Sequence, residues 1–598
     1  MFQKFDEAGN PSQGPERLAA LRQAMARAGL DGFIVPRADA FQGEYVAPCD
    51  ARLAWLTGFT GSAGFCIALR DEAGIFVDGR YRVQVRAQVD EAAFSPVEWP
   101  EVQPWEWVKP RLGRGARLGF DPWLHTIAEI GRYRDGLAGS GIELTGCDNL
   151  VDRIWADRPG PPMGRVIDYP VELAGESSHD KRKRLAQRLR EAGQRAAVIT
   201  LPDSICWLLN LRGADIERNP VVQAFAVLHD DARVTLFSEP GKFSGIDLPA
   251  GVKLERFDAF QRALAALAGP VRLEHESASQ KVADILAAAG TTVLPGRDPC
   301  SLPKARKNAV EIAGMRKAHL RDGAAMATFL CWLDDAMRRP GLSEIEIVEK
   351  LEECRRATGV LRDISFDTIC GSGPNGALPH YRVSERSNRT LRPGDLIVID
   401  SGGQYLDGTT DITRTVAMGP AGQDERLAFT RVLQGMIAIS RVRWPRGRTG
   451  RDLDPLARYP LWAAGQDFDH GTGHGVGAYL CVHEGPQRIS RLSEIALEPG
   501  MILSNEPGYY REGAFGIRTE NLVVVREAPP LAGADARDML GFETLTFVPI
   551  DTGLIVAEAL APAERDWLNA YHAEVRRKIG PHLEGETARW LKKATAPI

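Results

Sequence analysis

The last third of the chain repeatedly places a carboxylate at the end of an apolar run of the kind that forms buried strands. The carboxylates belong to Asp400, Asp411, Glu506 and Glu520, and the imidazole of His474 lies among them in sequence. A carboxylate is costly to bury unless positive charge compensates it. Four carboxylates that converge with an imidazole would repel one another, and some would hold protons, unless cations lay between them. Two divalent cations carry the matching charge, so this pattern predicts a two-metal hydrolase.

Length and charge limit the other functions open to the chain. At 598 residues it is too long for one core, and domains of about 100–200 residues suggest three or four. The 74 basic and 79 acidic side chains leave a net charge of −5, which argues against a nucleic-acid-binding surface. No apolar run approaches the roughly 18–20 residues of a membrane span, and residues 1–7 lack the apolar core of a secretory signal. We therefore expect a cytoplasmic protein without nucleic-acid or membrane partners.

The cysteines do not form a recognisable framework. There are 9, an odd number, and they are scattered without a C-x-x-C pair. A disulfide scaffold or a cysteine-rich zinc site would need paired spacing. We expect reduced thiols that serve as small apolar side chains.

Two stretches rich in proline and glycine, residues 158–164 and 294–303, divide the chain into three pieces. The first two pieces share a plan, at residues 16–37 and again at 181–200, in which a helical period leads through Ala-Gly to a strand. The expected fold class is α/β (α+β), with diverged α/β copies at 1–160 and 161–303. The third domain, 304–598, begins with helices, and Asn308 with Glu311 forms a capping pair for the first of them.

Asp400 and Asp411 are separated by a segment that contains Ser401-Gly402-Gly403 and Asp407-Gly408. These glycines predict turns, so two strands joined here can bring the two aspartates together. Asp407 stands beside a glycine and is interpreted as a turn residue.

The segment His470-Gly-Thr-Gly-His474-Gly-Val-Gly resembles the i, i+4 histidine pair of a zinc-binding helix. Each glycine costs a helix about 1 kcal/mol, so we expect a loop or tight turn in which the two histidines need not share a metal. The glycines could instead cradle a phosphate, but no Walker lysine follows them.

Further candidates lie in the same glycine-rich region. His380 and His483 join His470 and His474, so four of the 11 histidines fall between residues 380 and 483. Glu506 is expected to end a strand at a turn. Glu520 is expected inside a strand, on one face with Arg518, which could orient its carboxylate or form only a surface ion pair.

The candidate ligands also bear on the metal. Four carboxylates and one imidazole make a hard, oxygen-rich site that suits Mn, Co or Fe better than a thiolate-rich site would, and Zn stays possible. Two ions roughly 3.5–4 Å apart can share a water and make it nucleophilic.

Taken together, these motifs make the chain similar to a known family. The matching segments are residues 399–405, 408–415, 470–477, 482–486, 504–510 and 517–521, with 56–64, 78–81, 210–215 and 567–572 outside them. The chain resembles the three-domain, cytosolic type of Xaa-Pro aminopeptidase (aminopeptidase P), of the pita-bread metallopeptidase family. The resemblance implies two creatinase-like N-terminal α/β domains, then a pita-bread catalytic domain with a C-terminal extension.

The resemblance also implies roles for individual residues. Asp400 and Glu520 would bridge or flank two divalent metal ions, with Asp411 on one ion and His474 and Glu506 on the other. The substrate would be bound by His380, His470, His483 and Arg518. His380 and His470 would line the pocket for the proline ring, and His483 would steady the oxyanion. Glu506 would also take part in proton transfer.

The implied reaction releases the N-terminal residue from peptides with proline in second position, by attack of a hydroxide that bridges the two ions. With this ligand set we expect manganese foremost, with Co, Fe or Zn as alternatives. The resemblance and the length of the non-catalytic half suggest a homodimer.

Three alternatives stay open on the sequence. A prolidase would use the same metals on dipeptides only, but prolidases are shorter. A creatinase-like hydrolase works without metal and lacks most of the ligands. A non-enzymatic binding protein of the pita-bread fold would have lost ligands as well.

Overall fold

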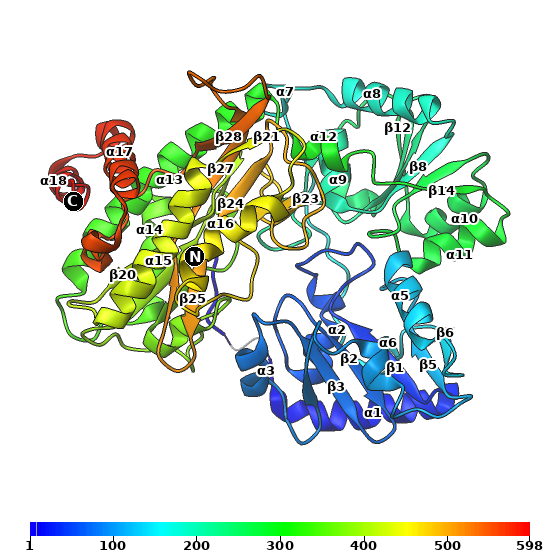
Figure 1. The fold of residues 1–598 in the computed structure, drawn as a ribbon. Coiled ribbons are helices and arrows are strands. Elements are labelled where there is room, and N and C mark those ends of the chain that lie inside the picture. Colours follow the sequence, from blue (N-terminus) through cyan, green and yellow to red (C-terminus); the bar gives the residue numbers. More distant parts are fainter. Residues whose placement is uncertain (7–8) are drawn as a thin grey trace. The chain divides into compact units, whose positions relative to one another are not determined.

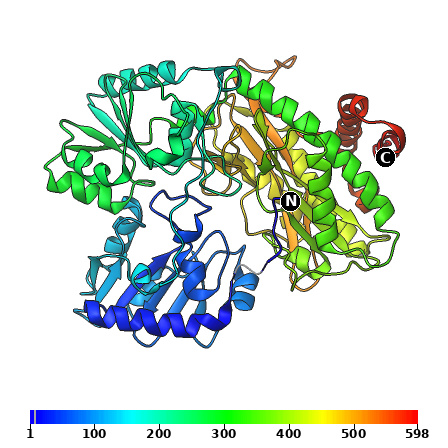
Figure 2. The ribbon, with the colours of Figure 1, turned by 180° about the vertical axis from the view of Figure 1, so that it is seen from behind.

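The structure, a computed structural model, describes residues 1–6 and 9–598 (Figures 1 and 2). It divides into two compact units, Ala8–Ser301 and Leu302–Ile598 with Met1–Glu7. Among the described residues, no helix combines the length and the apolar character that a membrane span requires.

The Ala8–Ser301 unit contains two six-stranded sheets. The first has the order β4 (Ser95–Glu98), β3 (Ala73–Val77), β2 (Phe65–Leu69), β1 (Gly32–Pro36), β5 (Arg117–Phe120), β6 (Glu143–Gly146). The second has the order β12 (Val252–Glu255), β11 (Val234–Phe237), β10 (Phe225–His229), β8 (Ala196–Ile199), β13 (Val271–Leu273), β14 (Val293–Pro295). Corresponding neighbours pair in the same direction in both sheets, so the internal repeat expected from the sequence is confirmed.

The two copies meet at the N-termini of α5 (Ile127–Leu137) and α11 (Gln280–Ala288). Ile127 N donates to Ala278 O at 3.0 Å, and Gln280 N donates to His125 O at 2.8 Å. These bonds join equivalent positions in opposite directions, so the two copies are related by a local pseudo-twofold axis.

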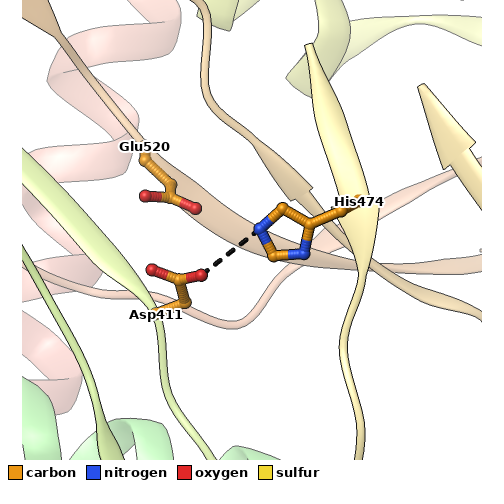
Figure 3. Close-up of side chains that lie close together, drawn as sticks. All are labelled: Asp411, His474 and Glu520. Atoms are coloured by element: carbon orange, nitrogen blue, oxygen red, sulfur yellow. Dashed lines mark ion pairs between the residues drawn. The ribbon is translucent and has the colours of Figure 1, made fainter. Parts of the chain in front are cut away.

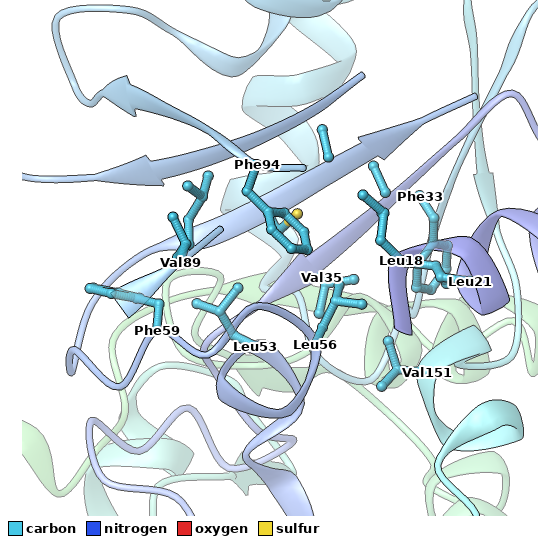
Figure 4. Packing of buried hydrophobic residues seen from close by; sticks show 14 of the residues in the cluster. Leu18, Leu21, Phe33, Val35, Leu53, Leu56, Phe59, Val89, Phe94 and Val151 are labelled. Atoms are coloured by element: carbon cyan, nitrogen blue, oxygen red, sulfur yellow. The ribbon is translucent and has the colours of Figure 1, made fainter. Parts of the chain in front are cut away.

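The first copy shows why the helical period was readable. Leu18, Leu21 and Met25 of α1 (Gly14–Ala28) follow the spacing of one helix face, and all three are buried. Figure 4 shows Leu18 and Leu21 packed with Phe33 of β1 in this core. Gly29 ends the helix with φ of 66°, a left-handed conformation that glycine adopts without strain.

The Leu302–Ile598 unit places its strands between two pairs of helices. In Figure 1 the pair α15 (Gln423–Arg441) and α16 (Gly450–Trp462) lies over the strands. Seen from behind in Figure 2, the pair α13 (Ala309–Ala336) and α14 (Glu344–Arg356) covers them. α13 begins at the expected capping box of Asn308 and Glu311. The helices α17 (Pro562–Ile579) and α18 (Gly585–Ala594) follow the last strand.

Two main sheets, a further three-stranded sheet and a hairpin lie in this unit. The small sheet has the order β16 (Ile369–Ser372), β17 (Leu396–Ser401), β20 (Ile412–Ala417). The larger has the order β21 (Arg443–Pro445), β28 (Met539–Thr544), β27 (Asn521–Glu527), β24 (Ile502–Asn505), β22 (Gly473–Gly475), β23 (Glu484–Ile489). The hairpin joins β25 (Gly508–Arg511) to β26 (Phe515–Arg518), and β18 (Gly403–Tyr405) pairs with β15 (Asp363–Ile364) and β19 (Gly408–Thr409). The candidate ligands lie where the two main sheets meet.

Candidate metal centre

The small sheet supplies the two aspartates. Asp400 lies in β17 opposite Thr413 of β20, and Asp411 directly precedes β20. The antiparallel pairing therefore turns the chain back so that both carboxylates reach the same end of the sheet, as the glycine-rich connection predicted. Asp407 lies in the turn between β18 and β19, where Arg321 pairs with it at 3.0 Å.

The large sheet supplies the other three candidates at strand ends. His474 lies in β22, Glu506 follows β24, and Glu520 precedes β27. Glu506 N donates to Thr472 O at 2.9 Å, which ties it beside β22. Glu520 N donates to Thr413 O at 3.2 Å, and this backbone bond joins the large sheet to the small one.

Two sequence expectations about these elements are wrong. Glu520 does not lie inside a strand, because the chain leaves β26 at Arg518 and begins β27 at Asn521. His474 does not lie in a loop or tight turn but in the short strand β22. The glycines on either side of it serve close packing, since a Cβ on Gly473 would clash with Ser504 O.

The structure brings Asp411, His474 and Glu520 together, with one ligand atom from each lying within 4.8 Å of the others. Figure 3 shows the three side chains pointing toward one another from separate segments of the chain. His474 Nε2 lies 3.4 Å from Asp411 Oδ2 and 3.4 Å from Glu506 Oε1. His474 Nδ1 faces Gly475 O at 3.0 Å and must donate to it, so Nε2 is the atom directed at the carboxylates.

The pKa values of the clustered side chains show that the cluster lacks positive charge. Burial, reinforced by Asp411 and Glu506, raises the pKa of Asp400 to about 7 despite the opposing guanidinium of Arg518. Burial and the neighbouring carboxylates of Asp411, Glu506 and Asp400 raise the pKa of Glu520 well above its usual range. Burial opposes the charge on His474, but Asp411 and Glu506 outweigh it and raise its pKa to about 9. Cations bound here would displace these protons.

Two carboxylate oxygens support the fit of such cations. Asp400 Oδ1 and Glu520 Oε1 are buried and have no hydrogen-bond partner among the described residues. A buried carboxylate oxygen without a donor is destabilising, and a divalent cation would satisfy it. Oxygen donors with one imidazole are also the ligand set that hard or borderline divalent ions prefer. The residues present therefore fit two divalent ions.

Arg518 acts on a different carboxylate from the one expected. It is only 2% exposed, so the surface ion pair is excluded, and its Nη2 donates to Asp400 Oδ2 at 2.6 Å. Its link to Glu520 is indirect, because Arg518 Nε donates to Thr413 Oγ1 at 3.3 Å and that hydroxyl donates to Glu520 Oε2 at 2.6 Å.

Three further histidines were expected near these ligands. The ring of His483 lies 4.4 Å from that of His474, centroid to centroid. His470 Nε2 lies 2.8 Å from Tyr510 Oη, whose hydroxyl also accepts from Arg518 Nη1 at 2.5 Å. His380 follows Pro379, whose carbonyl accepts from Arg518 Nη2 at 3.2 Å. His483 therefore lies against a candidate ligand, His470 is linked to Arg518 through Tyr510, and His380 directly follows a residue bonded to Arg518.

The sequence analysis missed three supporting hydroxyls, those of Thr413, Ser504 and Tyr510. Ser504 Oγ donates to Glu506 Oε1 at 3.0 Å, as Thr413 does to Glu520. Two of these residues lie two positions from a candidate ligand: Ser504 precedes Glu506, and Thr413 follows Asp411. Strand alternation places such pairs on one face, and this signal could have found them.

Arg414 holds the backbone of Glu520 from behind. This buried guanidinium donates to Glu520 O at 2.5 Å, to Val548 O at 2.8 Å and to Tyr571 Oη of α17 at 3.0 Å. The segment that follows the last strand is therefore linked to the candidate ligand Glu520 through Arg414.

Comparison with family models gives four matches along the chain. Metallopeptidase family M24 matches residues 313–527, and the C-terminal region of that family matches 538–598. Two models of the creatinase/prolidase N-terminal domain match residues 17–154 and 157–311.

Several known proteins are similar over nearly the full length. Aminopeptidase P2 of Arabidopsis thaliana is 39% identical, covering 98% of this chain and 88% of its own. A probable Xaa-Pro aminopeptidase P of Laccaria bicolor is 39% identical, covering 98% and 93%.

Solved structures give the same result. X-prolyl aminopeptidase from Caenorhabditis elegans, described as a cytosolic enzyme with a di-nuclear active site, superposes with a TM-score of 0.92 at 33% identity, covering 98% of this chain and 99% of its own. A dipeptidase from Mycobacterium ulcerans has a TM-score of 0.51 at 25% identity and covers only 64% of this chain. The chain therefore belongs to metallopeptidase family M24, in the group of full-length relatives named Xaa-Pro aminopeptidase.

Proposed function

We propose that this protein is a metal-dependent aminopeptidase that releases the N-terminal residue from peptides with proline in second position. The observation that carries the proposal is the buried cluster of Asp411, His474 and Glu520 at the junction of two sheets, in a chain with full-length relatives named Xaa-Pro aminopeptidase. The specificity for proline comes from those relatives and from the likeness to the nematode enzyme.

The metal would be held by Asp400, Asp411, His474, Glu506 and Glu520. Two divalent ions are proposed, with manganese foremost because four carboxylates favour a hard cation. When bound, such ions polarise the peptide carbonyl and activate water as a nucleophile.

The chain's own groups would complete the site. His483, beside His474, would donate to the oxygen on which negative charge develops. Burial raises the pKa of Glu506 above its usual value, which favours a carboxyl group that takes up and releases a proton, and we assign it to proton transfer.

Substrate binding is assigned to the groups around Arg518. His470 Nδ1 faces Gly471 O at 2.7 Å and its Nε2 lies 2.8 Å from the hydroxyl of Tyr510, so both ring nitrogens are engaged and the orientation of the ring is fixed. The imidazole of His470 would contact the proline ring. His380 and Arg518 would bind other parts of the peptide.

The remaining proposals concern the whole protein. We propose three domains that meet near residues 160 and 303, supported by the separate sheets at 32–146 and 196–295. A homodimer is supported by exposed apolar residues on α16, namely Leu456, Tyr459 and Trp462. A cytoplasmic location is supported by the likeness to an enzyme described as cytosolic.

The deciding experiment compares hydrolysis of Arg-Pro-Pro with that of Gly-Pro, with metal content measured on the same sample. Release of arginine from the tripeptide, lost on chelation and restored by Mn²⁺, is the expected result. Cleavage of the dipeptide alone would identify a prolidase, and full activity after complete metal removal would contradict the metal-dependent reaction.

A further inference from the structure

Glu484, which directly follows His483 in the chain, forms a buried cluster with two lysines from a distant segment. Glu484 Oε2 lies 3.0 Å from Lys304 Nζ, and Glu484 Oε1 accepts a short hydrogen bond from Lys307 Nζ. The three side chains are at most 3% exposed. We propose that Lys304 and Lys307 are positioning residues that hold Glu484 and thereby aim the imidazole of His483 at the reaction. The catalytic part of this inference rests on the proposed function.

The direction of the side chains supports the proposal. Glu484 is the first residue of β23, and His483 directly precedes the strand. The ring of His483 lies against His474, whereas the carboxylate of Glu484 is directed to the lysines. Contacts that restrain the side chain of Glu484 therefore also restrain the backbone that carries His483.

The backbone of Glu484 is also fitted closely against β22. Glu484 pairs with Gly475, and the register of the two strands shifts between His474 and Gly475. Such bulges re-aim side chains next to active sites. A Cβ on Gly475 would clash with Glu484 O, so only glycine permits this approach. The position of Glu484 thus bears on the separation of the His474 and His483 rings.

The lysines come from a segment with its own anchor. Lys304 lies in α12 (Ser301–Ala305), and Lys307 N donates to Gly500 O at 3.0 Å. Gly500 has φ of 88°, and a Cβ there would lie 2.6 Å from Lys307 O. Arg306, between the two lysines, pairs instead with Glu498 at 2.5 Å, where both side chains are about one third exposed.

One lysine on each carboxylate oxygen restrains the carboxylate more than a single partner would, because rotation would break both contacts. Burying these charges is costly unless they are paired. Loss of Glu484 would remove the buried negative charge that faces both ammonium groups, so its variants are expected to unfold. Loss of one lysine leaves a neutral pair, and the lysines are therefore the informative positions.

The kinetic test uses Lys304→Met and Lys307→Met, with Arg306→Ala as the matched control from the same segment. We expect kcat on Arg-Pro-Pro to fall about tenfold in each lysine variant, a fraction of the roughly 10²–10³ that loss of a whole oxyanion donor costs. KM should change by less than about twofold, metal content should stay at the wild-type value, and Arg306→Ala should match the wild type. A rise in KM alone, or loss of metal, would overturn the proposal.

A double-mutant cycle separates positioning from general damage. In a His483→Ala background each lysine substitution should lower kcat by less than about twofold, because the imidazole that the lysines position is absent. The full tenfold loss in that background would show that the lysines act independently of His483, and would overturn the proposal.

A measurement without catalysis keeps the inference separate from the proposed function. In protein labelled with ¹³C at histidine Cε1, His483→Ala identifies the His483 resonance. We expect this resonance to shift in both lysine variants and to stay in place in Arg306→Ala. An unshifted resonance would overturn the positioning role, whereas failure of the wild type to cleave Arg-Pro-Pro would overturn only the proposed function.

Discussion

At the scale of single residues, the candidate ligands differ in the side chains that hydrogen-bond to them. This difference decides which substitution tests metal binding without disturbing other contacts. Asp400 is held by Arg518 and Glu520 by Thr413, so changes there also disturb a hydrogen-bond network. Asp411 lies against His474 at 3.4 Å. Its removal should act mainly on the ligand set.

We predict that Asp411→Ala abolishes peptidase activity and removes most of the metal from one site, because the remaining carboxylates no longer balance two divalent ions. Metal analysis and an Arg-Pro-Pro assay on the same sample measure both effects. Asp407→Ala is the matched control, since Asp407 lies in a nearby turn and pairs with Arg321. Full activity in Asp411→Ala would exclude the two-metal interpretation.

His483→Ala should lower kcat by about 10²–10³, the usual cost of losing one oxyanion donor. Its metal content should stay near that of the wild type, because His483 is assigned to the substrate. Steady-state kinetics with elemental analysis distinguishes the two roles. Metal lost together with activity would reassign His483 as a ligand.

At the scale of elements, local signals were sufficient where the chain itself carries the cause. The period of Leu18, Leu21 and Met25 predicted α1, and the capping pair of Asn308 and Glu311 predicted the start of α13. Both signals depend on residues a few positions apart, so no knowledge of the tertiary fold was needed.

The expectations failed where a distant partner decides the structure. The strand is interrupted at Glu520 because the amide of Glu520 bonds to Thr413 of another sheet. No glycine or proline at this point announces the interruption in the sequence. The glycines beside His474 indicated a loop, but they are needed for close approaches, Gly473 to Ser504 and Gly475 to Glu484. Arg518 was matched to Glu520 by strand alternation, yet it reaches across to Asp400. The residue types of the site were readable from the sequence, whereas their pairing depends on how the sheets meet.

The helix α17 carries a histidine that should make the fold sensitive to acid. His572 is buried, and its Nε2 accepts from Ile550 N at 3.1 Å. Burial, with the charges of Arg414 and Arg576, lowers its pKa to about 4 from the usual 6.5. The folded state therefore binds this proton less readily than the unfolded state, so the stabilisation is complete above pH 6.5 and is lost as pH falls toward 4.

Between pH 6.5 and 4 we expect the titration of His572 to lower the free energy of unfolding by on the order of 3 kcal/mol, at 1.36 kcal/mol per pKa unit. His572→Gln keeps a hydrogen-bond acceptor but cannot titrate. Urea unfolding of metal-free protein between pH 7 and 4 should show a flatter pH dependence in this variant than in the wild type. Identical pH slopes would rule out His572 as the source.

At the scale of the whole molecule, exposed apolar side chains on α16 predict self-association. Leu456, Tyr459 and Trp462 are 39%, 69% and 47% exposed and follow a spacing of three residues on one helix. We expect light scattering to give twice the chain mass of 65.5 kDa. Tyr459→Lys combined with Trp462→Lys should give a folded monomer, because two charges on the patch oppose its burial.

Leu531→Lys provides the control, since Leu531 is 57% exposed and belongs to the connection between β27 and β28. This variant should keep the wild-type mass. A wild-type monomer with full activity would contradict the homodimer.

The bonds of Arg414 have a consequence for how the protein is made. A ribosome synthesises Asp400 well before Glu520, and Tyr571, which shares Arg414 with Glu520, later still. A nascent chain therefore cannot complete this set of bonds until α17 has left the exit tunnel. Translation itself therefore delays the hydrogen bonds behind Glu520 until almost the whole chain has been made.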